Sequence, residues 1–494
     1  MTSPEGASQH LEVERKFDVV DSTVSPSFEG IAAVARVERT PALRLDAVYF
    51  DTPGRDLAAH RITLRRRTGG SDAGWHLKLP AGPEARTEVR APLGADEIPG
   101  DLRDVVLAIV RDRPLEPVAR ITTSRTVEHL YGPDGRALAE FADDHVSAWA
   151  EGDVDEQHWR EWEVELSEEG GADEQLLDRL SNRLLDAGAQ PAGHGSKLAR
   201  VLDGSVPQPG PAPAPDEPVH RAVAAEVDNL LVWDRAVRAD VEDSIHQMRV
   251  TTRKIRSLLQ ASESAFGLSD DAWILDELRQ LASVLGIARD AEVLAERYER
   301  ALDEMPDELV RGPVRERLVE GARRRYRSGW RKSMAAMRSQ RYFRLLDALE
   351  GLVAAEPPPL EDGDEISSDT TVASGYQRVR KQAKRAKKAE MEHRDEALHR
   401  VRKSAKRLRY TAAAVDAKRV SEAAKNIQSL LGDHQDSVVS RTHLSQQSEA
   451  AHGADEDTFT YGLLYAREAQ LARDCREQLR PVLKALNKAV RKEL

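Results

Sequence analysis

The first two hundred residues alternate between apolar and polar side chains in short runs. In "LEVERKF", residues 11–17, a strand would place Glu12, Glu14 and Lys16 on one face and the apolar side chains on the other. Similar runs are "RLDAVYFDT", "ITLRRR", "WHLKLP" and "REWEVELSE", with turn signals such as "TGG" and "PDG" between runs. This pattern predicts an antiparallel β domain, with helices near residues 100–112 and 173–189.

The period changes after residues 205–218, "SVPQPGPAPAPDEP", which contain six prolines. Such a segment favours extended polyproline geometry, at ~3.1 Å per residue, and predicts a linker. Beyond it apolar residues recur with a period of 3.6, which indicates amphipathic helices, interrupted by an acidic, proline-rich loop at 356–370. We therefore expect a multidomain α+β protein with a β domain at 8–204, the linker at 205–218 and an all-α domain at 219–491, whose halves are 219–355 and 371–491.

The two helical halves repeat each other. "HQMRVTTRKIRSLL" from His246 and "HRVRKSAKRLRY" from His399 each place basic residues 3, 7, 8 and 10 positions after the histidine. Further along, "LGIARDAEVL" (285–294) echoes "LGDHQDSVV" (431–439). A repeat of this length with matched order predicts a duplicated helical bundle.

The 494 residues include 32% charged side chains, and the mean hydropathy is −0.56. No run of about 18 apolar residues predicts a membrane span, and the first residues do not resemble a signal peptide. We therefore expect a cytoplasmic protein without membrane contact. The lone Cys475 excludes an intrachain disulfide and a cysteine metal site. Of 73 basic and 85 acidic residues, 24 and 38 lie in residues 1–205, so this part has a net charge of −14 and the remainder +2.

Acidic residues gather at both ends of the β domain. "WEVEL" places Glu163 and Glu165 on one face, as the first strand does with its glutamates, and "LAEFADDHV" adds Asp143 and Asp144. If the first and last strands meet in a closed or nearly closed barrel, up to five carboxylates converge. Hard oxygen ligands in that number suit Mg²⁺ or Mn²⁺. The sequence alone leaves open whether Asp143 or Asp144 joins them.

The middle strands carry the opposite charge with the same period. Arg65 and Arg67 alternate in "ITLRRR", His76 and Lys78 share a face in "WHLKL", and two arginines flank Glu88 in "RTEVR". The forked donors of arginine suit phosphate oxygens. Taken singly, each strand is better interpreted as a solvated face with cross-strand ion pairs. Acidic strands at both ends with basic strands between favour a charged interior site.

This constellation resembles the CYTH family, also called triphosphate tunnel metalloenzymes, over about residues 9–203. The motifs that carry the resemblance are "EVERK", "LRRR", "HLKL", "WEVEL" and "GSKLAR", in family order. It implies an eight-stranded antiparallel tunnel with flanking helices that hydrolyses triphosphate with Mg²⁺ or Mn²⁺. The implied metal ligands are Glu12, Glu14, Asp144, Glu163 and Glu165, with Glu12, Glu14 and Lys16 as catalytic residues. The implied triphosphate-binding residues are Lys16, Arg65, Arg67, Lys78, Arg86, Arg120, Arg125 and Lys197.

The histidine repeats form two basic stripes. On a helix, His246 and the arginines at 249, 253 and 256 project within an arc of roughly 80°, and the second half repeats this arc. Residues 376–410 add 14 Lys/Arg against four Asp/Glu. A solvated helix face, a nucleic-acid site and a histidine metal site are alternatives, of which the last is disfavoured by the surrounding cations. A polyanion with closely spaced phosphates fits the stripes best.

Across about residues 218–490 the sequence resembles the CHAD family, the conserved histidine α-helical domain. The resemblance implies a helical bundle that binds inorganic polyphosphate without catalysis of its own. The implied polyphosphate-binding residues are His246, Arg249, Arg253, Lys254, Arg256, Arg289, His399, Arg402, Lys403, Lys406, Arg407 and Arg409. The second half departs from the first by having Gln435 in place of Arg289 and Lys406 in place of Arg253.

The combined expectation is a cytoplasmic metal-dependent hydrolase of triphosphate or short polyphosphate, joined to a polyphosphate-binding module that would bring it to polyphosphate granules. Three alternatives stay open: a non-catalytic polyphosphate-binding or sensing protein, an adenylate cyclase activity of the tunnel, and an RNA-binding role for the helical half. No obligate protein partner is evident in the sequence.

Overall fold

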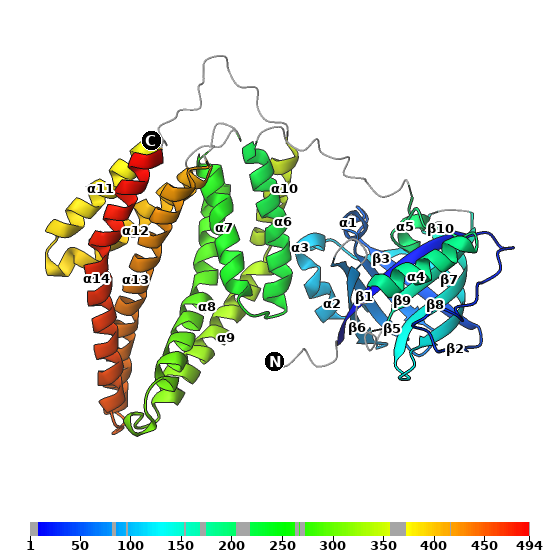
Figure 1. Ribbon diagram of the computed structural model, residues 1–494, viewed down its shortest axis with the longest axis horizontal. Helices are drawn as coiled ribbons and strands as arrows, with labels where there is room; N and C mark the ends of the chain where they lie inside the picture. Colours follow the sequence, from blue (N-terminus) through cyan, green and yellow to red (C-terminus); the bar gives the residue numbers. More distant parts are fainter. Residues whose placement is uncertain are drawn as a thin grey trace, which may run out of the picture. The chain divides into compact units, whose positions relative to one another are not determined.

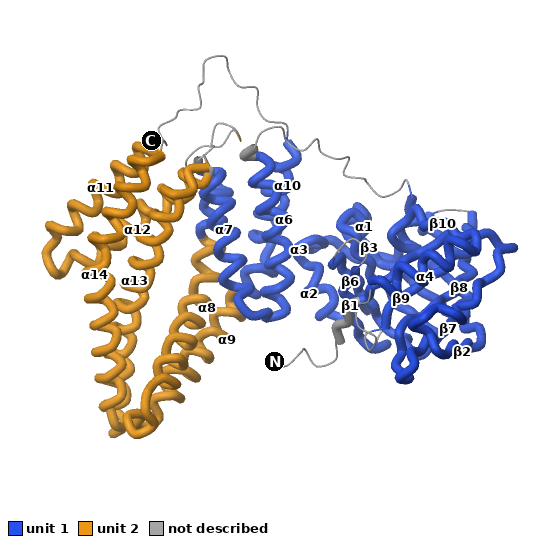
Figure 2. The backbone as a smooth tube through the Cα atoms, in the orientation of Figure 1, with its two compact units in different colours: residues 1–262, 270–279, 334–355 blue, residues 263–269, 280–333, 356–494 orange. Residues whose placement is uncertain are grey.

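The computed structural model describes residues 8–81, 85–94, 97–152, 155–167, 174–203, 218–261, 266, 272–355, 372–414 and 416–493. The chain divides into two compact units (Figures 1 and 2), of which unit 1 comprises residues 1–262, 270–279 and 334–355 and unit 2 the rest. The predicted linker at 205–218 lies outside the described residues except for Pro218, and the acidic loop at 356–370 lies outside them altogether.

The N-terminal part of unit 1 is one antiparallel sheet. Its strands are β1 (Ser8–Val19), β2 (Arg36–Arg39), β3 (Leu43–Asp51), β4 (Thr63–Thr68), β5 (Gly74–Pro80), β6 (Ala85–Pro92), β7 (Glu116–Tyr131), β8 (Ala137–Ala150), β9 (Gln157–Leu166) and β10 (Gln190–Pro191). The helices among them are α1 (Asp56–Ala59), α2 (Gly100–Val105), α3 (Leu107–Val110), α4 (Glu174–Asp186) and α5 (Lys197–Val201).

The sheet closes on itself through β1. Residues 8–13 of β1 pair with β6, and residues 14–19 pair with β9. The ring of described strands therefore runs β1–β6–β5–β4–β3–β7–β8–β9 and back to β1, an eight-stranded antiparallel barrel, with β2 paired to β7 and β10 to β1 outside the ring. Because side chains alternate along each strand, closure gives every strand one face toward the interior and one toward the outside.

The outer face of β1, β8 and β9 is apolar and is covered by α4. Phe17, Phe141 and Trp162 are buried there together with the leucines of α4. The Phe141 ring lies 5.0 Å from that of Phe28 and 5.7 Å from that of Trp162, an arrangement of aromatic rings that adds to the energy of burial. Arg15 fixes the helix by donating a hydrogen bond of 2.7 Å to Asp178.

One end of the barrel interior is also apolar, and α5 fills it. Tyr49 of β3, Ile121 of β7 and Val146 of β8 pack against Leu198 and Val201 of the helix. Ile121 and Val146 have the same strand parity as Arg125 and Asp144, so this cluster lies on the inward face. The helix therefore closes this end of the barrel, with Lys197 at its first position.

Unit 1 continues into helices α6 (Pro218–Arg238), α7 (Ser244–Ala261), the start of α8 (Trp273–Asp303) and α10 (Gln340–Ala354). The segment after α3 joins them to the barrel: the buried Arg111 donates a hydrogen bond of 2.6 Å to Glu350, and Gln340 donates one of 2.6 Å to Asp112. Arg111 also lies 3.3 Å from Asp347 of α10, so two carboxylates of this helix neutralise a cation that burial would otherwise penalise.

Unit 2 is helical. It contains the rest of α8, η3 (Asp307–Leu309), η4 (Glu316–Glu320), most of α9 (Gly321–Met337), α11 (Val372–Lys388), α12 (Met391–Ala414), α13 (Lys418–His452) and α14 (Phe459–Glu493). A buried ion pair ties α8 to α14, because Arg297 donates to both carboxylate oxygens of Glu468 at 2.6 and 2.5 Å. At Gly329 a Cβ atom would lie 2.7 Å from the Ala288 nitrogen, so glycine allows α8 and α9 to cross closely.

The predicted fold class is confirmed in the described residues: an antiparallel eight-stranded barrel with flanking helices precedes an all-helical region. The helices predicted near 100–112 and 173–189 correspond to α2 with α3 and to α4. None of the described helices combines the length and the apolar composition that a membrane span requires.

The aromatic cluster under α4 makes the outer core testable. We expect Phe141→Ala to lower the free energy of unfolding of the barrel by about 3–5 kcal/mol, because a buried ring is replaced by a cavity. Urea titration followed by tryptophan fluorescence measures this change. Val24→Ala is the control, since the Val24 side chain is 81% exposed and its truncation should change the stability by less than about 0.5 kcal/mol. Equal stabilities for the two variants would contradict the packing.

Candidate functional site

The barrel encloses a charged cavity of about 380 Å³. Eleven of the sequence-predicted residues line it: Glu12, Glu14, Lys16, Arg65, Arg67, Lys78, Arg86, Arg125, Glu163, Glu165 and Lys197. The register of β1 and β9 brings them together, because Glu14 stands opposite Glu165 and Lys16 opposite Glu163. The like-charged glutamates of the first strand therefore face those of the last strand across the closure of the barrel.

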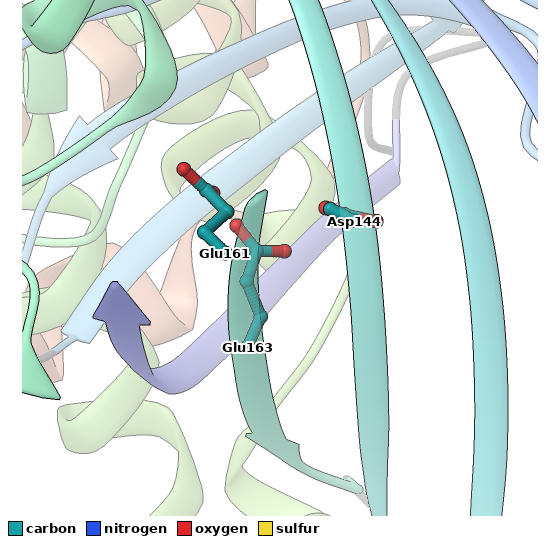
Figure 3. Close-up of side chains that lie close together, drawn as sticks. All are labelled: Asp144, Glu161 and Glu163. Carbon is teal, nitrogen blue, oxygen red and sulfur yellow. The ribbon is translucent and has the colours of Figure 1, made fainter. Parts of the chain in front are cut away.

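Three buried carboxylates lie close together on β8 and β9 (Figure 3). One oxygen from each of Asp144, Glu161 and Glu163 lies within 4.8 Å of the others. Lys197 of α5 is in contact with all three, with its Nζ 2.8 Å from Asp144, 2.6 Å from Glu161 and 2.7 Å from Glu163. Arg125 donates to Asp144 at 2.6 Å and to Glu163 at 2.5 Å. This set of hard oxygen donors matches the ligands that Mg²⁺ and Mn²⁺ prefer.

The cations of this cluster lower the pKa values of Asp144 and Glu163. Burial alone would raise the pKa of Glu163, but the neighbouring cations, led by Lys16 and Lys197, hold that pKa well below its usual range. Burial would also lower the pKa of Lys197, and the surrounding carboxylates, Asp144 first, raise it well above the usual range. A divalent ion entering this cluster would compete with ammonium groups that now occupy the carboxylate oxygens.

A second acidic group lies where β1 meets β9. Burial, followed by the charge of Glu12, raises the pKa of Glu165 to about 7. Burial raises the pKa of Glu12 as well, although the Lys78 ammonium lies 2.5 Å from it. Only Glu14 differs: burial opposes its charge, but Lys16 and Lys78 outweigh burial and lower its pKa to about 2. This region has more buried negative charge than its cations neutralise, which favours a bound cation.

Lysines contact two buried oxygens of the donor set. The Lys78 ammonium lies 2.5 Å from Glu12 Oε2, and the Lys197 ammonium lies 2.6 Å from Glu161 Oε1. A metal ion bound here would replace these ammonium groups on oxygens of the kind that hard divalent ions prefer. The residues present therefore fit a hard divalent metal ion.

The opposite wall is rich in cations. The Nε atoms of Arg65 and Arg67 are buried without a hydrogen-bond partner among the described residues, and Arg65 donates to the Tyr49 hydroxyl at 3.3 Å. Burial, followed by repulsion from Arg65 and Arg125, lowers the pKa of Arg67 to about 9. An anion bound between these side chains would relieve that repulsion and supply the missing acceptors.

Two predicted residues do not line the cavity. Arg120 is 62% exposed on the outer face of β7, where it pairs with Asp46 at 2.8 Å. Asp144 adjoins the cavity through its hydrogen bonds with Arg125. Its neighbour Asp143 points to the other side of β8 and accepts bonds from Arg160 and Ser25. Of the two aspartates left open by the sequence, Asp144 is therefore the one on the inward face.

Several functional candidates were missed in the sequence. Glu161 extends the two-residue period of Glu163 and Glu165 by one step, which was a usable signal. The sequence pattern gives Glu88 no role beyond its position between two arginines, yet it is fully buried in the cationic wall. The other cavity-lining residues that the sequence gave no role include Tyr49, Asp72, Arg90 and Glu140.

The basic stripes lie on α7 of unit 1 and α12 of unit 2, and their binding of polyphosphate stays a prediction. On α7, Lys254 pairs with Glu226 at 3.1 Å. In unit 2, Lys406 and Arg409 lie over the Tyr410 ring, 5.6 Å from its centroid. Arg289 forms an ion pair with Glu292 at 2.8 Å.

Within unit 2 the stripe packs against the later repeated motif. Burial, followed by the charges of Lys403 and Arg402, lowers the pKa of His399, which hydrogen-bonds Gln435. A Cβ atom at Gly432 would lie 3.5 Å from the Arg402 guanidinium, an ordinary contact distance, so this arginine packs against α13 at the glycine of "LGDHQD". The histidine stripe and the "QD" motif therefore form one local site.

Fold and site together define a two-part protein, a barrel with a charged interior followed by helices with basic stripes. A CYTH domain matches residues 10–187 and a CHAD domain matches residues 221–445, so the chain belongs to the proteins that combine these two families.

The chain is also similar to individual known proteins. The uncharacterized protein Rv2226 of Mycobacterium tuberculosis is 65% identical over 505 residues, covering 98% of each chain. The solved CHAD domain of the plant Ricinus communis shares 23% identity over 54% of this chain and 90% of its own, with a TM-score of 0.43. A putative adenylate cyclase from Bacillus halodurans shares 18% identity over 39% of this chain and 97% of its own, with a TM-score of 0.28.

The opposite orientations of Asp143 and Asp144 give a matched pair of variants. We expect Asp144→Asn to weaken Mn²⁺ binding at least tenfold, roughly the cost of disturbing the surroundings of a metal, because it removes a carboxylate from the inward cluster. Asp143→Asn should leave Mn²⁺ affinity unchanged, although it removes the partner of Arg160 and lowers stability. Titration of free Mn²⁺ by electron paramagnetic resonance measures both. A loss of affinity confined to Asp143→Asn would reverse the assignment.

Proposed function

We propose that the barrel hydrolyses inorganic triphosphate, or the ends of short polyphosphates, with Mg²⁺ or Mn²⁺, and that the helical region binds inorganic polyphosphate. The observation that carries this proposal is the juxtaposition, in one cavity, of buried carboxylates with two buried arginines, Arg65 and Arg67, whose Nε atoms have no hydrogen-bond partner among the described residues. A metal–triphosphate complex brings both the cation and the anion that such a cavity lacks.

The metal would be held by the carboxylates of the closure and the inward cluster: Glu12, Glu14, Asp144, Glu161, Glu163 and Glu165. When bound, it supplies charge neutralisation on the phosphates and polarises a phosphoryl oxygen. The phosphates would lie against the cationic wall and its neighbours: Lys16, Arg65, Arg67, Lys78, Arg86, Arg125 and Lys197. The exposed Arg120 has no role in this proposal.

Lys16 is suited to orient the attacking water. Its ammonium donates to Glu14 at 2.8 Å and contacts Glu163, so both sides of the closure fix its position. Burial would lower the pKa of Lys16, but Glu14 and Glu163 raise it above the usual range, so it stays a cation and a donor at neutral pH. A water beside it would donate to a carboxylate and direct its lone pair toward the terminal phosphorus.

The closed end of the barrel supports short substrates. Because α5 and its apolar contacts fill that end, a chain of phosphates can enter only from the other side. A long polyphosphate would present its end rather than an internal bond. In triphosphate every phosphoanhydride bond adjoins a terminal phosphate, so triphosphate would be the best substrate.

The helical proposal is supported by the stripe on α12. Arg402, Lys403, Lys406, Arg407 and Arg409 follow His399 along one helix, and the family resemblance implies polyphosphate as their ligand. Polyphosphate carries one charge per phosphate at close spacing, so several cations in line bind it with strong salt dependence. The acidic barrel would thus catalyse hydrolysis, and the basic stripes would bind polyphosphate.

Removing the two glutamates of β1 tests the catalytic part. We expect Glu12→Gln with Glu14→Gln to lower phosphate release from triphosphate and Mg²⁺ more than about 100-fold, because the carboxylates of the closure lose their charge. Retention on polyphosphate should be unchanged. The matched control is Glu38→Gln with Glu116→Gln, both exposed. Full metal-dependent activity in the first double variant would show that the site is wrongly assigned, and cyclic AMP from ATP as the main product would favour the cyclase alternative.

Charge reversal on α12 tests the capture part. We expect Lys403→Glu with Lys406→Glu to weaken polyphosphate binding at least tenfold at fixed salt, with phosphate release from triphosphate unchanged. Arg394→Glu with Arg400→Glu changes the net charge equally on the same helix outside the proposed set and should bind normally. Equal binding by the two double variants would contradict a specific stripe. Stronger retention on RNA than on polyphosphate would favour the nucleic-acid alternative.

A further inference from the structure

A buried histidine–carboxylate pair lies in the cationic wall of the barrel, and the proposed chemistry gives it no role. His76 of β5 is 1% exposed and Glu88 of β6 is fully buried. The His76 Nδ1 atom lies 2.9 Å from Glu88 Oε1, and its Nε2 atom lies 2.9 Å from the main-chain oxygen of Asp72. Both nitrogens of the ring are therefore used.

The two contacts together require one proton more than a neutral imidazole and a carboxylate carry. A main-chain carbonyl only accepts, so Nε2 must bear a hydrogen and donate it to Asp72. In a neutral imidazole Nδ1 is then an acceptor, and it faces a carboxylate oxygen that is also an acceptor. Two acceptors at 2.9 Å form a hydrogen bond only when a further proton lies between them.

The positive charges around the pair disfavour its protonation when the cavity holds no anion. Glu88 is contacted by Arg90, and Arg65 and Lys78 lie 3.9 and 4.0 Å from its Oε1 atom. Burial lowers the pKa of His76 to about 4, and the charge of Arg65 adds to this effect against the opposing bond to Glu88.

The other charged groups facing the pair are few. Arg67 comes from β4 and is paired with Asp72, and the charge of Glu12 of β1 interacts with that of Glu88. Lys78 is itself paired with Glu12 at 2.5 Å. The cations that repel a proton at His76 are thus among those assigned above to the phosphates.

We propose that the His76–Glu88 pair takes up a proton when triphosphate binds in the barrel, and so couples phosphate binding to protonation of the cavity wall. The proposal rests on the proposed function only in taking triphosphate as the anion. Phosphate charge on Arg65, Arg67 and Lys78 cancels their repulsion of the proton, and the protonated pair satisfies the hydrogen bond that the geometry contains. His76 is a positioning residue here, because it holds Glu88 and, through it, the phosphate-binding cations.

The sign of the pH dependence follows by linkage. A ligand whose binding takes up a proton binds more tightly as the pH falls, up to tenfold per pH unit for one proton. The range that matters is the pH between the pKa of the free pair and the pKa of the liganded pair. In this range the triphosphate affinity of the wild type should fall more steeply with rising pH than that of a variant without the histidine.

Calorimetry on the full-length protein measures the proton directly. Triphosphate is titrated at pH 7 without divalent metal, in two buffers whose ionisation enthalpies differ, and the difference in observed enthalpy gives the number of protons taken up. His76→Gln removes the titrating ring, whereas His158→Gln removes an exposed histidine that also lies beside a carboxylate, 3.6 Å from Glu156. Protonation of triphosphate itself contributes equally to all three proteins.

The expected result is an uptake for wild type and His158→Gln that exceeds that of His76→Gln by up to one proton per triphosphate. Binding with the same uptake in all three proteins would overturn this inference and leave the proposed function intact, whereas no binding to the wild type would overturn both. If His76→Gln does not fold, nitrogen-15 shifts of the His76 ring in the wild type decide: an imidazolium or shared-proton signal that appears with triphosphate supports the coupling, and an unchanged neutral ring refutes it.

Discussion

Closure of the barrel between β1 and β9 encloses charged side chains, which must then be neutralised inside the protein. Because Glu14 stands opposite Glu165 and Lys16 opposite Glu163, closing the ring moves several charges from water into one enclosed space. Taking ions out of water costs several kcal/mol each unless they are paired. In the cluster around Lys197 the carboxylates are paired with cations. The charges of the group around Glu165 and of the arginines on the opposite wall are only partly paired.

The remaining structure supports this charged interior. The outer face of β1, β8 and β9 packs its aromatic side chains under α4, so the barrel does not need an apolar interior to be stable. At one end α5 contributes both the apolar contacts that close the barrel and the ammonium of Lys197 that neutralises the acidic cluster. The incompletely paired charges of opposite sign lie within one cavity, and the proposal of a metal–phosphate ligand rests on this arrangement.

Much of this site could be predicted from strand period alone. The two-residue alternation placed Glu12, Glu14 and Lys16 on one face, and the structure has them lining the cavity. The same period predicts that Glu161 shares the face of the other glutamates of "EWEVE". It also predicts opposite faces for Arg120 and Arg125, because residues five positions apart cannot share a face in a regular strand. Arg120 is accordingly outside, paired with Asp46.

Other features needed three-dimensional information. The choice between Asp143 and Asp144 depends on the register of β8, which one strand cannot supply. The short run "GSKLAR" gave no sign that its leucine would close one end of the barrel. In the helices, the repeat identified the stripes, but the packing of Arg402 against α13 at Gly432 required the structure.

The most direct test of the central claim is a crystal structure with Mn²⁺ and a non-hydrolysable triphosphate analogue, with the metal located by its anomalous scattering. If buried, incompletely paired charges select a metal–triphosphate ligand, the manganese peak will lie among the carboxylates of β1, β8 and β9, with phosphate oxygens against Arg65 and Arg67. Manganese and analogue bound only on the outer surface of the barrel, with the interior ion pairs unchanged, would contradict the account.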